Sequence, residues 1–355
     1  EIDRYHLNEG HAALLIAGLL EEALPADEDP PCPPRTVDRV RSKCVFTTHT
    51  PVPAGHDQFD LGLAEQLLGR HFAHVRPIVE EQGALNMTYL ALRMSRYVNG
   101  VARKHAEVSR KMFAGYEIES ITNGVHTGTW VSEPFARLLD EYVSGWRADP
   151  ARIRYARSIP LDEIWAAHRE AKSALIRQVN RSTNVGMDED VFTIGYGRRM
   201  TRYKRPELLI SDPDRLGRIA TDRGALQIIY AGKAHPRDEQ GQDLIQQIHR
   251  VRSELPPQVR LAYLENYAMN LAGLMTAGTD LWLNTPEPPN EASGTSGMKA
   301  ALNAVPQLST LDGWWIEGHI EGVTGWAIGD GTTVEDEAVQ RARDADSLYA
   351  KLESK

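Results

Sequence analysis

Residues 291–299 bring together one carboxylate, several hydroxyls, small residues and one lysine. They lie between a short apolar strand predicted at 281–283 and a run of good helix formers at 298–304. Small residues let a backbone approach a ligand closely, and the amides at the start of a helix attract phosphate or clustered hydroxyls. Thr295 and Lys299 share a helix face if the helix begins at Thr295. A partly desolvated lysine there can form a Schiff base with a carbonyl cofactor, whereas the alternative is a plain loop and an exposed helical lysine.

The elements that must position this segment are predicted to form a doubly wound parallel sheet. From about Thr127 onward, short apolar strands alternate with helices, and ligands of such sheets bind beyond the carboxyl ends of the strands. Residues 1–125 predict mixed helix and loop, with a strand at 44–48 and one long helix along 87–112 in which Gly100 marks either a bend or a closely packed backbone. The strands predicted for the sheet are 191–196, 226–231, 259–264, 281–283 and 305–311, and residues 335–355 predict a polar helix.

Polar side chains follow four of these strands in turn. The segment after the first strand carries five cations within eight residues of an acidic chain, which indicates either a solvated charged face or a phosphate site. Its position after a buried strand favours a double phosphate site. Lys233 after the second strand is a further phosphate ligand or a solvated lysine, and Tyr267 after the third is a core aromatic or a site residue. The five cations are Arg198, Arg199, Arg202, Lys204 and Arg205.

Length and composition narrow the class of protein. A chain of 355 residues is long enough for two domains, and a formal net charge of −9 excludes a general affinity for nucleic acid or an anionic membrane. No apolar run reaches the roughly 18 to 20 residues that span a bilayer. Cys32 and Cys44 are expected to be free thiols of a reduced, cytoplasmic protein. The first residues contain no initiator methionine, so we expect the chain to begin at a boundary within a longer protein.

The string of residues 291–299 closely resembles the pyridoxal-phosphate lysine segment of the α-glucan phosphorylases, the glycogen, starch and maltodextrin phosphorylase family. The characteristic string of that family is Glu-Ala-Ser-Gly-Thr followed shortly by Met-Lys. The resemblance implies that Lys299 carries pyridoxal 5′-phosphate. It also implies that the reacting glucose is held by Glu291, Ala292, Ser293 and Gly294, and that the cofactor is surrounded by Thr295, Ser296, Gly297, Tyr267 and Arg198.

Further segments resemble the same family in the same order along the chain, from Leu7 to about Gly325. Residues 197–205 resemble the phosphate-gripping segment, which makes Arg199 and Lys204 catalytic together with Lys299 and assigns Tyr203 to the sugar. Here Arg198 stands where a lysine is usual and Thr201-Arg202 where His-Glu is common, and neither change removes an anion-binding charge. Two more segments assign His49 and Asn123 to glucose, although a structural histidine and a plain Asn-Gly turn are the alternatives. No metal is implied, and the roles left open are those of His6, His11, His56 and Asp57.

The resemblance implies two Rossmann-like lobes of the glycosyltransferase B type. Residues 1–125 would be the C-terminal part of a glucan-binding lobe and residues 126–355 the lobe that binds pyridoxal phosphate. Because the Gly-rich loop of the family has no counterpart, we expect an incomplete N-terminal lobe, a truncated member of the short bacterial-type branch and an almost inactive isolated chain. The intact enzyme would be a homodimer that converts α-1,4-glucan and inorganic phosphate to glucose 1-phosphate with retention. The alternatives are a nucleotide-sugar glycosyltransferase of the same architecture and a glucan-binding fragment without turnover.

Overall fold

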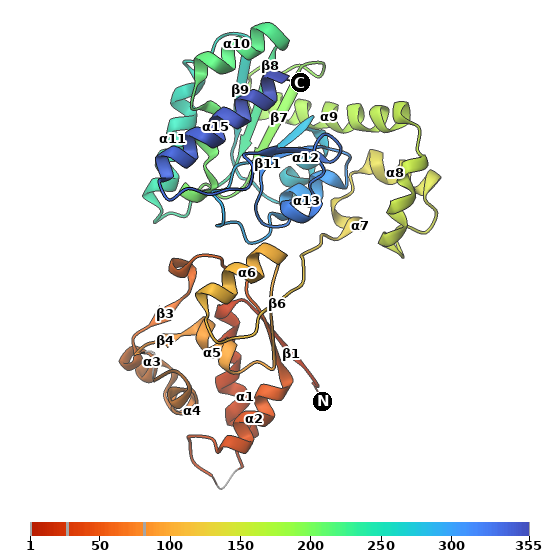
Figure 1. Ribbon diagram of the computed structural model, residues 1–355. Coiled ribbons are helices and arrows are strands. Elements are labelled where there is room, and N and C mark those ends of the chain that lie inside the picture. Colours follow the sequence, from red (N-terminus) through yellow and green to blue (C-terminus); the bar gives the residue numbers. More distant parts are fainter. Residues whose placement is uncertain (1, 26–27, 81–82, 355) are drawn as a thin grey trace. The chain divides into compact units, whose positions relative to one another are not determined.

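A computed structural model describes residues 2–25, 28–80 and 83–354 of the chain. They form two compact units, each with its own parallel sheet (Figure 1). The N-terminal unit comprises Glu1–Asn123 and Pro289–Ser293, and the C-terminal unit comprises Gly124–Pro288 and Gly294–Lys355. The predicted α/β class with two Rossmann-like lobes is therefore confirmed. Within the three described ranges, every helix is too short or too polar to cross a bilayer.

The N-terminal unit is built on a parallel sheet with the strand order β1-β2-β5-β6. Helices cover it, and their apolar residues join the strands in one core that includes Leu7, Phe46 and Leu90. The predicted strand at 44–48 is confirmed as β2. The strands are β1 (Tyr5–Asn8), β2 (Cys44–Thr47), β5 (Tyr97–Gly100) and β6 (Glu119–Ser120), with β3 (Gln58–Phe59) and β4 (Leu85–Asn86) in a separate antiparallel pair. The helices are η1 (Gly10–Leu14), α1 (Leu15–Ala23), α2 (Pro34–Lys43), η2 (Pro53–Gly55), α3 (Leu61–Leu68), α4 (Arg70–Val79), α5 (Met87–Arg93) and α6 (Arg103–Met112).

The single long helix expected along 87–112 is wrong. Strand β5 separates α5 from α6, because Val98 and Asn99 pair with β2 in the middle of the sheet. The Thr47 hydroxyl also donates to Asn99 Oδ1 at 2.9 Å. Pairing in the sheet overrides the helical spacing of the apolar residues. Of the two alternatives for Gly100, the closely packed backbone is correct, since a Cβ there would lie 3.1 Å from the Ala106 nitrogen.

The C-terminal unit contains a parallel sheet with the order β12-β11-β10-β7-β8-β9. Successive residues of its buried strands face opposite sides, so that Ile228 and Tyr230 enter one core and Ile229 and Ala231 the other. All five predicted strands are confirmed to within two residues at each end, and a sixth, β12, was not predicted. The strands are β7 (Phe192–Gly197), β8 (Leu226–Ala231), β9 (Val259–Leu264), β10 (Leu281–Asn284), β11 (Gln307–Thr310) and β12 (Gly325–Ile328).

Helices cover both faces of this sheet, which makes it doubly wound (Figure 1). One core takes residues from α10 (Pro213–Arg223), α11 (Glu239–Arg252) and α15 (Glu337–Ser354), and the other from α9 (Leu161–Thr183), α12 (Met269–Gly278) and α13 (Thr295–Ala301). The expected C-terminal helix is confirmed as α15. The remaining helices are α7 (Thr127–Trp130), α8 (Glu133–Tyr142), η4 (Pro150–Ser158), η5 (Arg202–Lys204), η6 (Pro206–Ile210) and α14 (Trp315–Gly318).

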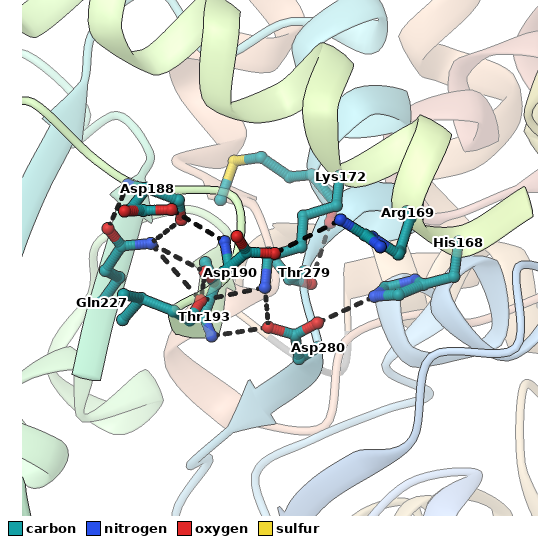
Figure 2. Close-up of polar contacts among 11 residues, drawn as sticks. His168, Arg169, Lys172, Asp188, Asp190, Thr193, Gln227, Thr279 and Asp280 are labelled. Carbon is teal, nitrogen blue, oxygen red and sulfur yellow. Dashed lines mark hydrogen bonds and ion pairs between the residues drawn. The ribbon is translucent and has the colours of Figure 1, made fainter. Parts of the chain in front are cut away.

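A buried polar network fastens α9 to the amino ends of β7 and β10 (Figure 2). Asp280 accepts from Lys172 Nζ at 2.6 Å and from the Thr193 amide at 2.7 Å, and its second oxygen lies 2.8 Å from His168 Nε2. The side chains of His168, Lys172 and Asp280 are each at most 9% exposed. Gln227 continues the network from β8 by donating to the carbonyl of Asp188 at 2.8 Å. At this edge of the sheet, the buried charges of Lys172 and Asp280 therefore compensate each other within the protein.

Candidate functional site

The candidate site of the C-terminal unit lies at the opposite, carboxyl edge of the six-stranded sheet. β7, the first strand of this sheet along the chain, lies between β8 and β10. The chain adds β8 and β9 on one side of β7 and then crosses over to add β10, β11 and β12 on the other side. The order of the strands reverses between β7 and β10, which is where ligands of open α/β sheets bind. The cationic segment follows β7 and the lysine segment follows β10. The fold thus places these two segments on neighbouring strands.

Hydrogen bonds join the two segments directly. The Glu287 amide donates to the Tyr203 carbonyl at 2.7 Å, and the Thr285 hydroxyl lies 2.9 Å from the Lys204 carbonyl. Tyr196 of β7 donates to that same carbonyl at 2.9 Å. Lys204 is buried, and its Nζ lies 4.4 Å from the centroid of the Tyr203 ring. The main chain that carries Tyr203 and Lys204 is consequently fixed on two sides.

The five cations after β7 differ in whether a carboxylate lies beside them. Arg202 forms an ion pair with Glu337 at 2.8 Å, and Arg205 forms one with Asp344 at 2.8 Å. Both carboxylates belong to α15, which had no predicted role. Arg199 is exposed at the sheet edge. Arg202 and Arg205 are therefore paired within the protein, and the phosphate site expected of the cluster stays a prediction.

The lysine segment folds as expected into a loop and a helix that begins at Thr295. Gly294 precedes the helix with φ of 86°, a conformation that favours glycine. Thr295 and Lys299 therefore share one face. Lys299 Nζ lies 3.8 Å from the centroid of the Trp130 ring, and burial lowers the pKa of Lys299. A lysine with a lowered pKa carries more of the neutral amine that attacks a carbonyl.

Trp130 and Asn303 contact Lys299 in the candidate site, and the sequence did not reveal them. Asn303 is fully buried, and its Nδ2 donates to the carbonyls of Trp130 at 2.8 Å and Lys299 at 2.9 Å. Its Oδ1 accepts from the Ser132 amide at 2.8 Å. Asn303 follows Lys299 by one helical turn, a spacing that could have drawn attention to it. Nothing local to Trp130 indicates that it packs on a lysine so distant in sequence.

Tyr267 lies just after β9, and its side chain contacts β7. Its hydroxyl donates to the Gly197 carbonyl at 3.2 Å, and burial raises its pKa to about 12, an effect that the Arg198 charge partly opposes. A Cβ at Gly197 would lie 2.9 Å from both the Tyr267 hydroxyl and the Trp282 ring. Gly297 is similarly constrained, because a Cβ there would overlap the Gln307 side chain. Ser296 accepts from Trp282 Nε1 at 3.2 Å, which ties the start of α13 to β10.

The N-terminal unit holds His49 in a network of its own. His49 Nε2 lies 2.6 Å from Asn8 Oδ1, and the His49 amide donates to Glu9 Oε2 at 2.7 Å. Burial lowers the pKa of His49, which the Glu9 charge partly opposes, so the neutral imidazole is favoured at pH 7. Glu9 adopts φ of 73° while its carboxylate also accepts from the Thr50 hydroxyl at 2.8 Å. The Asn123 amide donates to the Val101 carbonyl at 3.0 Å.

The division into units separates most sugar candidates from the phosphate and cofactor candidates. The N-terminal unit contains His49, Asn123, Glu291, Ala292 and Ser293. The C-terminal unit contains Arg198, Arg199, Tyr203, Lys204, Tyr267, Gly294, Thr295, Ser296, Gly297 and Lys299.

The sequence was compared with those of known proteins. A family model described as carbohydrate phosphorylase matches residues 72–325, which is most of the chain. The chain belongs to the carbohydrate phosphorylase family. It is 39% identical, over 98% of its length and 45% of the relative, to a maltodextrin phosphorylase of Thermococcus litoralis. Glycogen phosphorylases of Aquifex aeolicus and Mycobacterium tuberculosis are 35% and 34% identical, over 99% and 98% of this chain and 55% and 45% of the relatives. The chain thus spans about half the length of the curated relatives it matches.

The residues of this phosphorylase-family chain fit a pyridoxal phosphate cofactor. An aldehyde condenses with a neutral primary amine, and Lys299, whose pKa is lowered, carries more of that form. A phosphoester is bound by cations, and Arg198, Arg199 and Lys204 follow a strand at the same sheet edge. Trp130 offers an aromatic face beside the lysine. The donor set therefore matches the chemistry of the group.

Proposed function

We propose that this chain acts in the phosphorolysis of α-1,4-glucans by inorganic phosphate, which yields glucose 1-phosphate with retained anomeric configuration. The observation that carries the proposal is the partly buried Lys299, held against Trp130 at the switch point of a phosphorylase-family sheet. The printed names of the relatives, maltodextrin phosphorylase and glycogen phosphorylase, support the same substrate class. As in many phosphorylases, a homodimer would be the working assembly.

Each candidate residue has a role that its chemistry supports. Lys299 would hold the cofactor, with Arg198, Tyr267, Thr295, Ser296 and Gly297 around it. Arg199 and Lys204 would bind the phosphate anions. Two close anions raise the pKa of one another, and fixed cations beside them allow a proton to be shared while offsetting the remaining charge. When bound, pyridoxal phosphate would supply its 5′-phosphate as the proton relay to the substrate phosphate.

Sugar recognition would fall to polar groups that are held in place before substrate binds. His49 is oriented by Asn8 and Glu9, so its ring can bond a glucose hydroxyl without first losing mobility. Asn123, Tyr203 and residues 291–294 would complete the glucose contacts. Glu291 would accept from a sugar hydroxyl, so the reaction does not require the paired carboxylates of glycosidases. The N-terminal unit would thus be the glucan-binding lobe and the C-terminal unit the cofactor lobe.

The experiment that tests the proposal is mapping of the cofactor lysine. The chain is incubated with pyridoxal 5′-phosphate, reduced with borohydride and digested, and the peptide masses are measured by mass spectrometry. We expect a phosphopyridoxyl adduct on Lys299, and the same adduct yield in Lys351→Ala, a control that changes a half-buried lysine of the same unit, paired with Glu321 on the surface. Glucose 1-phosphate release from maltoheptaose is measured on the loaded chain. An unmodified Lys299 in the presence of excess cofactor would contradict the proposal.

A further inference from the structure

Arg205 is a buried arginine that the roles above leave unused. Its side chain is 5% exposed, and all three guanidinium nitrogens have partners within the C-terminal unit. Nε donates to the Thr285 carbonyl at 2.9 Å, Nη2 donates to the Pro286 carbonyl at 3.0 Å, and Nη1 lies 2.8 Å from Asp344 Oδ2. A planar guanidinium can satisfy three acceptors in this fixed geometry, which a lysine ammonium cannot reproduce.

The backbone of Arg205 is as closely held as its side chain. It adopts φ of 47° and ψ of 55°, the left-handed region in which a side chain other than that of glycine is unfavourable. The Thr285 hydroxyl lies 2.8 Å from the Arg205 carbonyl. Surrounding contacts must outweigh the cost of this conformation, which is commonly found beside functional sites. Arg205 therefore bonds residues 285–286 through both its side chain and its main chain.

These contacts connect the two segments of the candidate site. Arg205 immediately follows Tyr203 and Lys204 at the end of residues 197–205, the phosphate segment. Residues 285–294 form the cofactor-lysine loop, which leads from β10 to the helix that carries Lys299. The counter-ion, Asp344, is 3% exposed and comes from α15. Gln340, one turn earlier in α15, donates to Asp344 Oδ1 at 2.9 Å, which orients the carboxylate. Helix α15 thus reaches the phosphate segment through one buried ion pair.

We infer that Arg205 is a positioning residue, which fixes the phosphate segment to the cofactor-lysine loop with Asp344 as its oriented counter-ion. The inference rests on the function proposed above, because it deepens the account of that phosphate site. Arg205 acts through Lys204 and Tyr203. Its loss should therefore weaken phosphate binding and leave attachment of the cofactor to Lys299 intact, since Lys299 is held independently by Asn303 and Trp130.

The test compares Arg205→Lys with Arg215→Lys in the full chain. Arg215 is a matched control, because it also pairs with α15, at 2.6 Å to Glu353 and 2.7 Å to Asp346, but lies on α10 away from the phosphate segment. Each protein is loaded with pyridoxal 5′-phosphate, and the ³¹P resonance of the bound cofactor is followed during titration with inorganic phosphate. Hydrogen exchange of residues 202–208 and 285–288 is measured on the cofactor-free chains.

We expect Arg205→Lys to give a normal adduct at Lys299, to need at least tenfold more inorganic phosphate for the same ³¹P change, and to exchange at least tenfold faster in both segments. Arg215→Lys should stay within twofold of the wild type in all three measurements. Equal losses in both variants, or an Arg205→Lys protein within twofold of wild type, would overturn the inference. If Arg205→Lys fails to fold, Asp344→Asn, which keeps the guanidinium, is judged by the same criteria.

Failure of the proposed function has a different signature. A wild-type chain that forms no adduct at Lys299 contradicts the proposed function by itself. The exchange comparison needs no cofactor, so it still decides whether Arg205 holds the two segments together.

Discussion

The two edges of the sheet in the C-terminal unit use buried charge in different ways. At the amino edge, the carboxylate of Asp280 is surrounded by Lys172, His168 and the Thr193 amide, so the charges compensate one another within the protein (Figure 2). At the carboxyl edge, Arg199 is exposed and Lys299 Nζ faces an aromatic ring. A cation facing an indole gains less than one paired with a carboxylate, which leaves it available to a ligand.

From this difference we predict that the amino edge contributes mainly to stability and that the carboxyl edge contributes mainly to binding. The same strands carry both sets of residues, since β7 and β10 begin at the Asp280 network and end at the phosphate and lysine segments. Arg205 and Asp344 are the exception at the carboxyl edge, because they form a buried pair there. Mutations at the two edges should therefore separate stability from ligand binding.

The largest effect is expected from Asp280→Asn, which removes the carboxylate and leaves Lys172 buried without its counter-charge. Breaking a buried ion pair from one side costs about 3–5 kcal/mol. The free energy of opening, measured by hydrogen exchange of the β7 and β10 amides, should fall by about this amount. Asp190→Asn is the control, because its partner Arg169 is 60% exposed, and a change within about 0.5 kcal/mol is expected. Equal losses in the two variants would contradict the stabilising role of the amino edge.

The fold was predictable where local pattern and tertiary pairing agree. Residues 226–231 and 259–264 were predicted with the correct ends, because each is an apolar run bounded by turn residues. Strand β12 was missed because Gly325–Ile328 is short and begins with glycine, and its place depends on parallel pairing with β11. The helix expected at 87–112 was wrong for the same reason, since pairing with β2 decides the state of β5.

The candidate site was predictable only as separate strings. Lys299 and the cations after β7 could be recognised from residues close to them in sequence, and the strand order explains why their two segments follow neighbouring strands. The contacts of Trp130 with Lys299 and of Arg205 with Asp344 join residues far apart in the chain. No periodicity or local composition encodes such pairs, because they depend on how the helices pack on the sheet.

A smaller effect is expected from Lys204→Ala, which removes a buried cation from the carboxyl edge. If Lys204 stabilises developing negative charge, the turnover of a full-length enzyme should fall by more than about two orders of magnitude, or about 2.7 kcal/mol, as for other preorganised donors. Glucose 1-phosphate release from maltoheptaose measures the change, and glucan affinity should change much less. Arg202→Ala is the control in the same segment, because its pair with Glu337 is exposed. Loss of glucan binding with unaltered phosphate dependence would instead assign Lys204 to the sugar.

The smallest effect concerns how the amino edge responds to pH. Burial raises the pKa of Asp280, but the hydrogen bonds from His168 and Lys172 and the charge of Lys172 outweigh it, so the pKa lies below its ordinary value. A carboxyl whose pKa is lowered by folding stabilises the protein above its unfolded pKa of about 3.9 and loses that contribution as pH falls through the folded value. The difference in opening free energy between wild type and Asp280→Asn should therefore shrink as the pH falls below about pH 4. Hydrogen exchange of the β10 amides, corrected for intrinsic rates, measures this difference. A difference that grows as the pH falls below about pH 4 would show that Asp280 is not the charged member of the network.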